Sequence, residues 1–185
     1  MSGLRVIAGK ARGRKLRPVP GEVTRPITDR TKESLFNILG ADIVSSSMLD
    51  LFAGTGAVGI EALSREAAFV RFVDVYQPAV QTIRANLDGT GLKQNSDVRK
   101  IDAFRLLDNP PDRAFQYIYI APPQYKQLWK RAARKLDENP GWLTDDAWVI
   151  IQIHPVEYEP LVLKNLVEFD QRRYGSTLLV FFERT

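Results

Sequence analysis

The chain has 185 residues, of which 44% are hydrophobic and 26% charged, with a net charge of +4. This length and composition predict a globular protein with a substantial core. No apolar run approaches the roughly 18 residues of a membrane span, and the N-terminus lacks an apolar signal segment. The absence of cysteine excludes disulfides and thiolate metal sites, and the single histidine excludes a multi-histidine metal site. We therefore expect a cytoplasmic protein without a bound metal or a membrane partner.

Basic side chains concentrate near the N-terminus. Residues 1–32 hold nine basic and two acidic side chains, whereas the remainder holds 17 basic and 20 acidic ones. This asymmetry predicts an arm that contacts RNA phosphates, although a solvated tail is the alternative. Apolar residues interleave with the charges, so we expect residues 1–27 to form a basic N-terminal β-hairpin with strands at 4–8 and 14–19. The candidate RNA-binding residues are Arg5, Lys10, Arg12, Arg14, Lys15, Arg25 and Arg30.

The first helix is predicted after this arm. Thr28 or Asp29 is a suitable N-cap, and Gly40 is a suitable end. Between them, Leu35, Ile38 and Leu39 form the predicted buried stripe.

Strand and helix patterns then alternate. We predict strands at 47–52, 69–75, 97–102, 115–121 and 147–153, and helices at 57–66, 77–88, 103–108, 124–137 and, more weakly, 156–165. Two further β-rich runs, 167–174 and 177–183, are joined by a glycine and a serine. Residues 28–185 thus predict an α/β, Rossmann-like domain: a mostly parallel seven-stranded sheet with a C-terminal antiparallel hairpin and helices on both faces.

A glycine-rich turn follows the first predicted strand. Gly54, Gly56 and Gly59 match the spacing G-x-G-x-x-G at the start of a helix, where open α/β sheets bind nucleotides. Asp50 stands four residues earlier, and its carboxylate would repel a pyrophosphate. S-adenosylmethionine (SAM) carries an ammonium, a sulfonium and a ribose but no phosphate, so the pattern favours SAM over NAD. A glycine-rich turn without a ligand is the alternative.

Two more aspartates end the next strands. Asp74, beside Val75, ends the second strand about 20 residues after the glycine turn, where it can accept both ribose hydroxyls. Asp102, beside Ala103, follows the third strand, where it can accept a hydrogen bond from the adenine amine or act as a helix N-cap.

The fourth strand ends in a stiff loop, Ala121-Pro122-Pro123-Gln124-Tyr125. Prolines have no N–H, so the carbonyls of this loop are free to accept an exocyclic amine, and the tyrosine can stack on a flat base. A simple strand terminator is the alternative. His154, after the fifth strand, is an acid/base candidate, although a lone histidine is more often structural.

In combination these motifs resemble the RsmD-like family of 16S ribosomal RNA guanine-N2 methyltransferases. The segments that carry the resemblance are 5–16, 25–37 and 49–65, and the resemblance extends over about residues 4–153. It implies that the basic arm grips RNA, and that SAM is held by Asp50, Phe52, Ala53, Gly54, Thr55, Gly56, Asp74, Val75, Asp102 and Ala103. It also implies a catalytic loop made of Ala121, Pro122, Pro123 and Tyr125.

In the family the aromatic residue of this loop directly follows the two prolines, whereas here Gln124 intervenes before Tyr125. The family also differs from this chain at the first loop position. Its loop begins with Asp or Asn, which supplies a side-chain acceptor for the target amine, whereas this chain has Ala121. We predict a SAM-dependent methyltransferase that modifies N2 of a guanine in small-subunit rRNA, as naked RNA or as a subunit assembly intermediate. The alternatives are a SAM- and RNA-binding protein without catalysis, and a methyltransferase that acts on another nucleic acid or a small amine. We expect a monomer.

Overall fold

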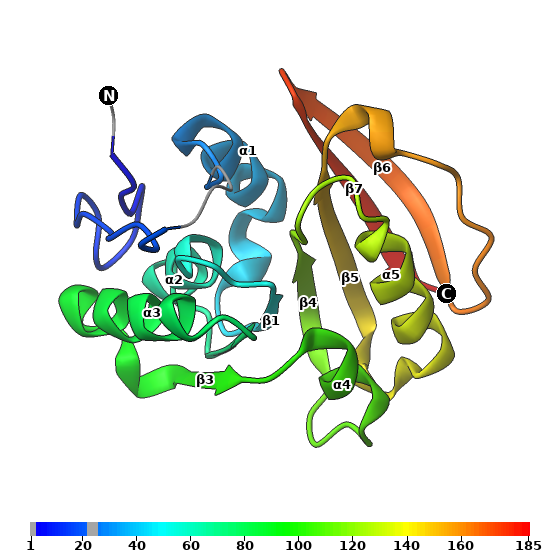
Figure 1. Ribbon diagram of the computed structural model, residues 1–185, viewed down its shortest axis with the longest axis horizontal. Helices are drawn as coiled ribbons and strands as arrows, with labels where there is room; N and C mark the ends of the chain where they lie inside the picture. The colour runs from blue at the N-terminus through cyan, green and yellow to red at the C-terminus, as the bar shows by residue number, and fades with distance from the viewer. Residues whose placement is uncertain (1–2, 22–25) are drawn as a thin grey trace. The chain divides into compact units, whose positions relative to one another are not determined.

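The computed structural model describes residues 3–21 and 26–185. The chain divides into two compact units, Met1–Ile101 and Asp102–Thr185, which together contain seven strands (Figure 1). Among the described residues, no helix is both long and apolar enough to cross a membrane.

The first unit alternates helices and strands. Its elements are α1 (Asp29–Leu39), β1 (Ser47–Leu51), α2 (Ala57–Ser64), β2 (Phe69–Asp74), α3 (Gln77–Thr90) and β3 (Ser96–Lys100), with short 3₁₀ turns at Gly40–Ile43 and Lys93–Asn95. Strand β2 pairs in parallel with both β1 and β3, which gives the order β3-β2-β1. Helix α2 contacts β1 and β2, and α3 contacts β2 and β3 (Figure 1). The parallel pairing brings the carboxyl ends of the strands to one edge.

Helix α1 begins and ends as its sequence predicts. The Thr28 side chain accepts a hydrogen bond from the Thr31 N–H, and Gly40 ends the helix with a φ of 57°. Its buried apolar face is formed by Leu35, Phe36 and Leu39, while the predicted Ile38 is only half-buried.

The second unit ends in the predicted antiparallel pair. Its elements are α4 (Ala103–Asp108), β4 (Phe115–Ile120), α5 (Leu128–Glu138), β5 (Leu143–Ile153), β6 (Leu166–Tyr174) and β7 (Thr177–Arg184), with 3₁₀ turns at Pro140–Trp142 and Pro155–Glu157. Strands β4 and β5 are parallel, and β7 runs antiparallel to both β5 and β6, which gives the order β4-β5-β7-β6. The prediction of an α/β sheet with an antiparallel C-terminal hairpin is confirmed.

Two elements begin four residues away from their predicted starts, while the other boundary differences are of one or two residues. Helix α5 begins at Leu128 instead of residue 124, because Tyr125 and Gln127 have φ values of 65° and 56° and a helix cannot pass through that region. Strand β5 begins at Leu143 instead of residue 147, because Leu143 pairs with Phe115 across an irregularity in the register.

The predicted helix at 156–165 is wrong. Only the turn Pro155–Glu157 is helical, and the chain then runs without regular structure to β6. The carboxylate of Asp137 accepts the backbone N–H groups of Lys164, Asn165 and Leu166. Because a side chain on α5 binds these donors, they are not available to an i→i−4 helical ladder.

The predicted N-terminal β-hairpin is also wrong. Its two runs meet in one isolated antiparallel bridge, between Arg5 and Lys15, and form no named strand within residues 3–21. The N–H groups of Ile7 and Ala8 donate to the Glu61 carboxylate instead of to a partner strand. Backbone hydrogen bonds flank the bridge, from the Val6 N–H to the Arg14 carbonyl and from the Leu16 N–H to the Leu4 carbonyl, but the pairing does not extend into named strands. The division at residue 27 stays a prediction.

Candidate active site

The glycine turn forms an open cradle at the carboxyl end of β1. Phe52 and Gly54 have φ values of 58° and 57°, and the Ala53 N–H donates to the Val73 carbonyl at 2.9 Å. A Cβ built on Gly54 would meet nothing within 4 Å. The backbone at this glycine is therefore bare on the side where a side chain would stand, and a ligand can approach it closely.

The third glycine of the motif brings α2 against the sheet. A Cβ on Gly59 would lie 2.3 Å from Cε1 of Phe72 on β2. Only a glycine permits this approach, which holds the start of α2 beside the ends of β1 and β2.

Asp50 lies beneath the turn with 2% of its surface exposed. Its carboxylate accepts the Gly59 N–H at 3.3 Å. Burial raises the pKa of the Asp50 carboxyl well above its usual range; the Gly59 hydrogen bond opposes the shift, and the charge of Asp74 adds to it. A buried carboxylate with one hydrogen bond is suited to a cationic ligand, which would supply the missing counter-charge.

Asp74 ends β2 and closes the turn from the other side. One carboxylate oxygen accepts the Gly54 N–H and the other accepts the Tyr76 N–H, both at 2.9 Å. Each carboxylate oxygen has two lone pairs, so both oxygens retain capacity for a hydroxyl donor. The neighbouring Val75 is 61% exposed, which leaves an apolar surface beside this carboxylate.

Asn86 on α3 joins the turn to the basic arm and was not predicted. Its Nδ2 donates to the carbonyls of Thr55 (3.0 Å) and Arg17 (3.1 Å), and its Oδ1 accepts the Arg17 N–H at 2.7 Å. The sequence carries a signal for this role, because Asn86 falls on the apolar stripe of α3 with Ile83 and Leu87. A polar residue in such a stripe needs buried partners.

In the second unit, Asp102 acts as the N-cap of α4. Its Oδ1 accepts the N–H groups of Phe104 (2.9 Å) and Arg105 (3.1 Å), and Ala103 is buried beside it. The N-cap interpretation of Asp102 is confirmed, while its role toward adenine stays a prediction.

The loop after β4 is fixed by a buried carboxylate that was not predicted. Glu157, which is 5% exposed, accepts the Tyr125 N–H at 2.8 Å and the His154 N–H at 3.3 Å. Pro122 is buried and Ala121 half-buried, while Pro123 and Tyr125 are exposed. The loop therefore presents the Tyr125 ring to solvent from a pinned backbone.

The His154 ring lies beside the Tyr125 ring. The two ring centroids lie 5.8 Å apart with a tilt of 42°. His154 Nδ1 accepts the Val156 N–H at 3.2 Å, so in this arrangement the ring carries its proton on Nε2. This bond gives His154 a structural role in the turn after β5, and the acid/base role stays a prediction.

The basic arm is docked on α2 by Glu61, which is fully buried. Its carboxylate accepts the N–H groups of Ile7 (2.9 Å) and Ala8 (3.1 Å) and Nε of Arg65 (2.9 Å). The buried Lys32 ammonium lies 3.6 Å away. Burial lowers the pKa of Lys32, and the charge of Glu61 opposes this shift. Because the acceptor is ionised and buried, these bonds are stronger than ordinary backbone pairs.

Ser64, one turn further along α2, completes the docking. Its hydroxyl donates to the Ala8 carbonyl at 2.6 Å and accepts the Ala11 N–H at 3.0 Å. Gly9 has a φ of 84°, and a Cβ there would lie 1.9 Å from the Ser64 carbonyl oxygen. Val6 and Leu16 are buried as well. Residues 3–21 of the arm thus pack as part of the first unit, in contrast to the solvated-tail alternative.

The predicted RNA-binding cations differ in their surroundings. Arg5 pairs with Asp29 at 2.9 Å. Arg12, Arg14 and Lys15 are exposed and form no ion pair within the part of the chain that the structure describes, and Arg30 is also exposed. Arg25 lies outside the described residues. The tip of the arm therefore offers three cations to a polyanion.

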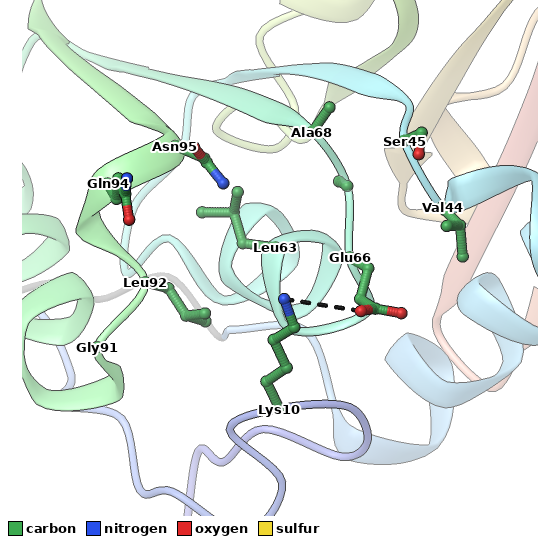
Figure 2. A pocket seen from close by; sticks show the side chains of 11 residues that line it. Lys10, Val44, Ser45, Leu63, Glu66, Ala68, Gly91, Leu92, Gln94 and Asn95 are labelled. Carbon is green, nitrogen blue, oxygen red and sulfur yellow. Dashed lines mark ion pairs between the residues drawn. The ribbon is translucent and has the colours of Figure 1, made fainter.

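Lys10 faces away from the glycine turn. It borders a hollow of about 380 Å³ in the first unit, where its ammonium lies 3.6 Å from the Glu66 carboxylate (Figure 2). The hollow is also lined by Ser45, Ala68 and Asn95, next to the starts of the strands. The hollow therefore lies at the opposite edge of the strands from the turn, and its lining includes one predicted RNA-binding residue, Lys10.

No group of three or more histidine, aspartate or glutamate side chains that could hold a metal ion is present in residues 3–21 and 26–185. The two carboxylates near the glycine turn are instead engaged by backbone N–H groups.

Comparison with known proteins agrees with this arrangement over the whole chain. A family model described as conserved hypothetical protein 95 matches residues 4–183. Ribosomal RNA small subunit methyltransferase D of Escherichia coli K12 is 37% identical over 182 residues, which cover 98% of this chain and 90% of that protein. The chain belongs to the RsmD/YlbH family. YlbH of Bacillus subtilis is also 37% identical, over 98% of this chain and 99% of that protein.

Solved structures show the same fold. The structure of yhhF from Escherichia coli has a TM-score of 0.87 and 33% sequence identity, and the match covers 98% of this chain and 97% of that one. An RNA methyltransferase from Salinibacter ruber in complex with S-adenosyl-L-homocysteine has a TM-score of 0.64 at 14% identity, over 86% of this chain and 94% of that one. The latter likeness concerns the fold alone, which is that of SAM-dependent methyltransferases.

Proposed function

We propose that this chain transfers a methyl group from SAM to the exocyclic N2 of a guanine in small-subunit (16S) ribosomal RNA. The observation that carries the proposal is the pair of carboxylates around the bare glycine turn, Asp50 beneath it and Asp74 beside it. The substrate follows from the relatives that are named for small-subunit rRNA methylation and that match 98% of this chain.

The residues around the turn fit SAM. Asp50 is buried and its hydrogen-bond partner among the described residues, the Gly59 N–H, carries no charge, so a ligand ammonium would favour its ionised form. Asp74 keeps lone pairs for the ribose hydroxyls, and Asp102 with Ala103 is assigned to adenine. When bound, SAM supplies an electrophilic methyl group on a sulfonium.

The loop after β4 is assigned to the target base. Its Pro122 and Pro123 have no N–H, so the loop carbonyls remain acceptors for the amine, and Tyr125 offers a face on which an unstacked base can lie. In the reaction the N2–CH₃ bond forms, the S–CH₃ bond breaks and one N2 proton leaves to solvent. Because the guanine N2 lone pair is delocalised into the ring, acceptors that hold its hydrogens also favour attack. We assign most of the rate acceleration to the proximity of the SAM methyl group and the N2 atom when both are bound.

The basic arm is assigned to the RNA backbone. Replacing the exposed Arg12, Arg14 and Lys15 by alanine should remove up to three phosphate contacts. The slope of log K against log salt should then become shallower by about 2–3. An unchanged slope would remove the arm from RNA binding.

One observation favours a second function. Ala121 cannot supply the side-chain acceptor that the family has at this position, and a protein that binds SAM and RNA without methyl transfer would tolerate it.

A methylation assay separates the two. Labelled SAM is incubated with small-subunit rRNA and with immature subunits, and the product base is mapped by mass spectrometry. We expect N2-methylguanine at one position. Bound SAM without any transfer, together with activity gained in Ala121→Asp, would establish the binding protein instead.

A further inference from the structure

The residue next to Ala121 in the sheet is a glutamine. The last paired residues of β4 and β5 are Ile120 and Ile151, in parallel register. Ala121 is the first residue after β4, and continuing this register by one step pairs it with Gln152 of β5. Residues at matched positions of parallel strands present their side chains on the same face of the sheet.

A hydrogen bond shows where the Gln152 carboxamide lies. Tyr119 is two residues before Ala121 and therefore shares its face. The Tyr119 hydroxyl donates to Oε1 of Gln152, so the carboxamide is on this face too. Gln152 is half-buried, and its side chain forms no other hydrogen bond within the described residues 102–185.

The carboxamide retains the bonding capacity that methylation of guanine N2 needs. With one lone pair of Oε1 engaged by Tyr119, the other can accept an N2–H, and both N–H donors of Nε2 remain. The N2 amine of guanine is a donor next to the N3 acceptor, and a carboxamide presents the complementary acceptor and donor. The methyl side chain of Ala121 leaves room beside it.

We propose that Gln152 is a catalytic residue that accepts the target amine in place of the side chain absent at Ala121, with Tyr119 as its positioning residue. This inference rests on the proposed function. It gives the strand β5 side chain the role that the family assigns to the first residue of the loop after β4.

The test compares Gln152→Leu, Gln152→Glu and the double variant Ala121→Asp/Gln152→Leu on small-subunit rRNA with labelled SAM. Gln152→Leu removes the acceptor and should lower kcat about 10²-fold, with KM for RNA and SAM affinity nearly unchanged. Gln152→Glu keeps an acceptor and should stay within about tenfold of wild type. The double variant should recover most of the loss because it returns an acceptor to position 121.

Two further variants complete the design. Tyr119→Phe should lower kcat about tenfold without changing KM, because the carboxamide loses one orienting bond. Gln171→Leu, on strand β6, is the matched control and should keep full activity. Unfolding midpoints show whether each variant is folded.

The outcomes separate this inference from the proposed function. If wild type and Gln152→Leu are equally active, the role of Gln152 is overturned while the proposed function stands. The same holds if the double variant is no more active than Gln152→Leu. Wild type that binds SAM and RNA without methyl transfer would overturn both.

Discussion

Replacing Glu61 by glutamine tests the docking of the basic arm. The carboxylate accepts three N–H groups and lies 3.6 Å from the Lys32 ammonium, with both side chains at 1% exposure or less. A carboxamide keeps one acceptor oxygen and turns an N–H₂ toward one of the backbone donors. It also removes the negative charge nearest to the buried Lys32 ammonium, which still donates to the Arg5 carbonyl.

The expected loss of unfolding free energy is about 3–5 kcal/mol, the usual cost of removing one partner of a buried ion pair. Adding Lys32→Met should restore part of this loss, because the uncompensated charge is gone. The recovery should be incomplete, because the carboxamide N–H₂ still faces a buried backbone N–H. That unsatisfied donor costs about 1–3 kcal/mol. Urea denaturation of wild type, the two single variants and the double variant measures the coupling.

Glu66→Gln, in the turn that follows α2, is the matched control. Its pair with Lys10 has side chains 58% and 65% exposed, so its loss should be below about 1 kcal/mol. A Glu61→Gln protein as stable as Glu66→Gln, with an unchanged salt dependence of RNA binding, would refute the docking role.

Three further predictions follow from the same geometry. Gly13→Ala, at a φ of 82° with open space around it, should cost about 1–2 kcal/mol of unfolding free energy. Gly9→Ala should cost clearly more and weaken RNA binding, because its Cβ meets the docked helix. Equal losses of unfolding free energy in urea denaturation would contradict this prediction. The raised pKa of Asp50 means that the folded apoprotein holds this proton more tightly than the unfolded chain does. Acidification through that pKa should therefore stabilise the apoprotein and weaken SAM binding. Calorimetric titration across pH should show this dependence for wild type, whereas Asp50→Asn should bind SAM weakly at every pH. Glu157→Gln should loosen the loop after β4 and lower kcat more than SAM affinity, whereas an unchanged kcat would show that Glu157 does not position the loop.

Much of the fold was predictable because its determinants are local. The cap at Thr28, the turn through Gly54 and the alternation of apolar runs each depend on residues within a few positions. The elements that were predicted wrongly also have a physical explanation. The helix predicted at 156–165 lost its N–H donors to Asp137, about 27 residues away along the chain, which no local pattern reveals.

The candidate site was predictable only in part. Asp50 and Asp74 were found because they stand at strand ends at characteristic distances in sequence from the glycine turn. Asn86, Glu157 and Gln152 were missed, because their roles depend on elements that approach them in space.

By itself, the sequence determined the order of strands and helices, the glycine cradle and the cationic character of the arm, since periodicity, turn chemistry and charge are properties of neighbouring residues. Only the tertiary structure decided where the arm's backbone donors go: the Ile7 N–H donates to Glu61, 54 residues later, which docks the arm on α2, while the expected hairpin is reduced to one bridge. It also placed Gln152 beside the alanine at the end of β4, because sheet register joins positions that are remote in the chain.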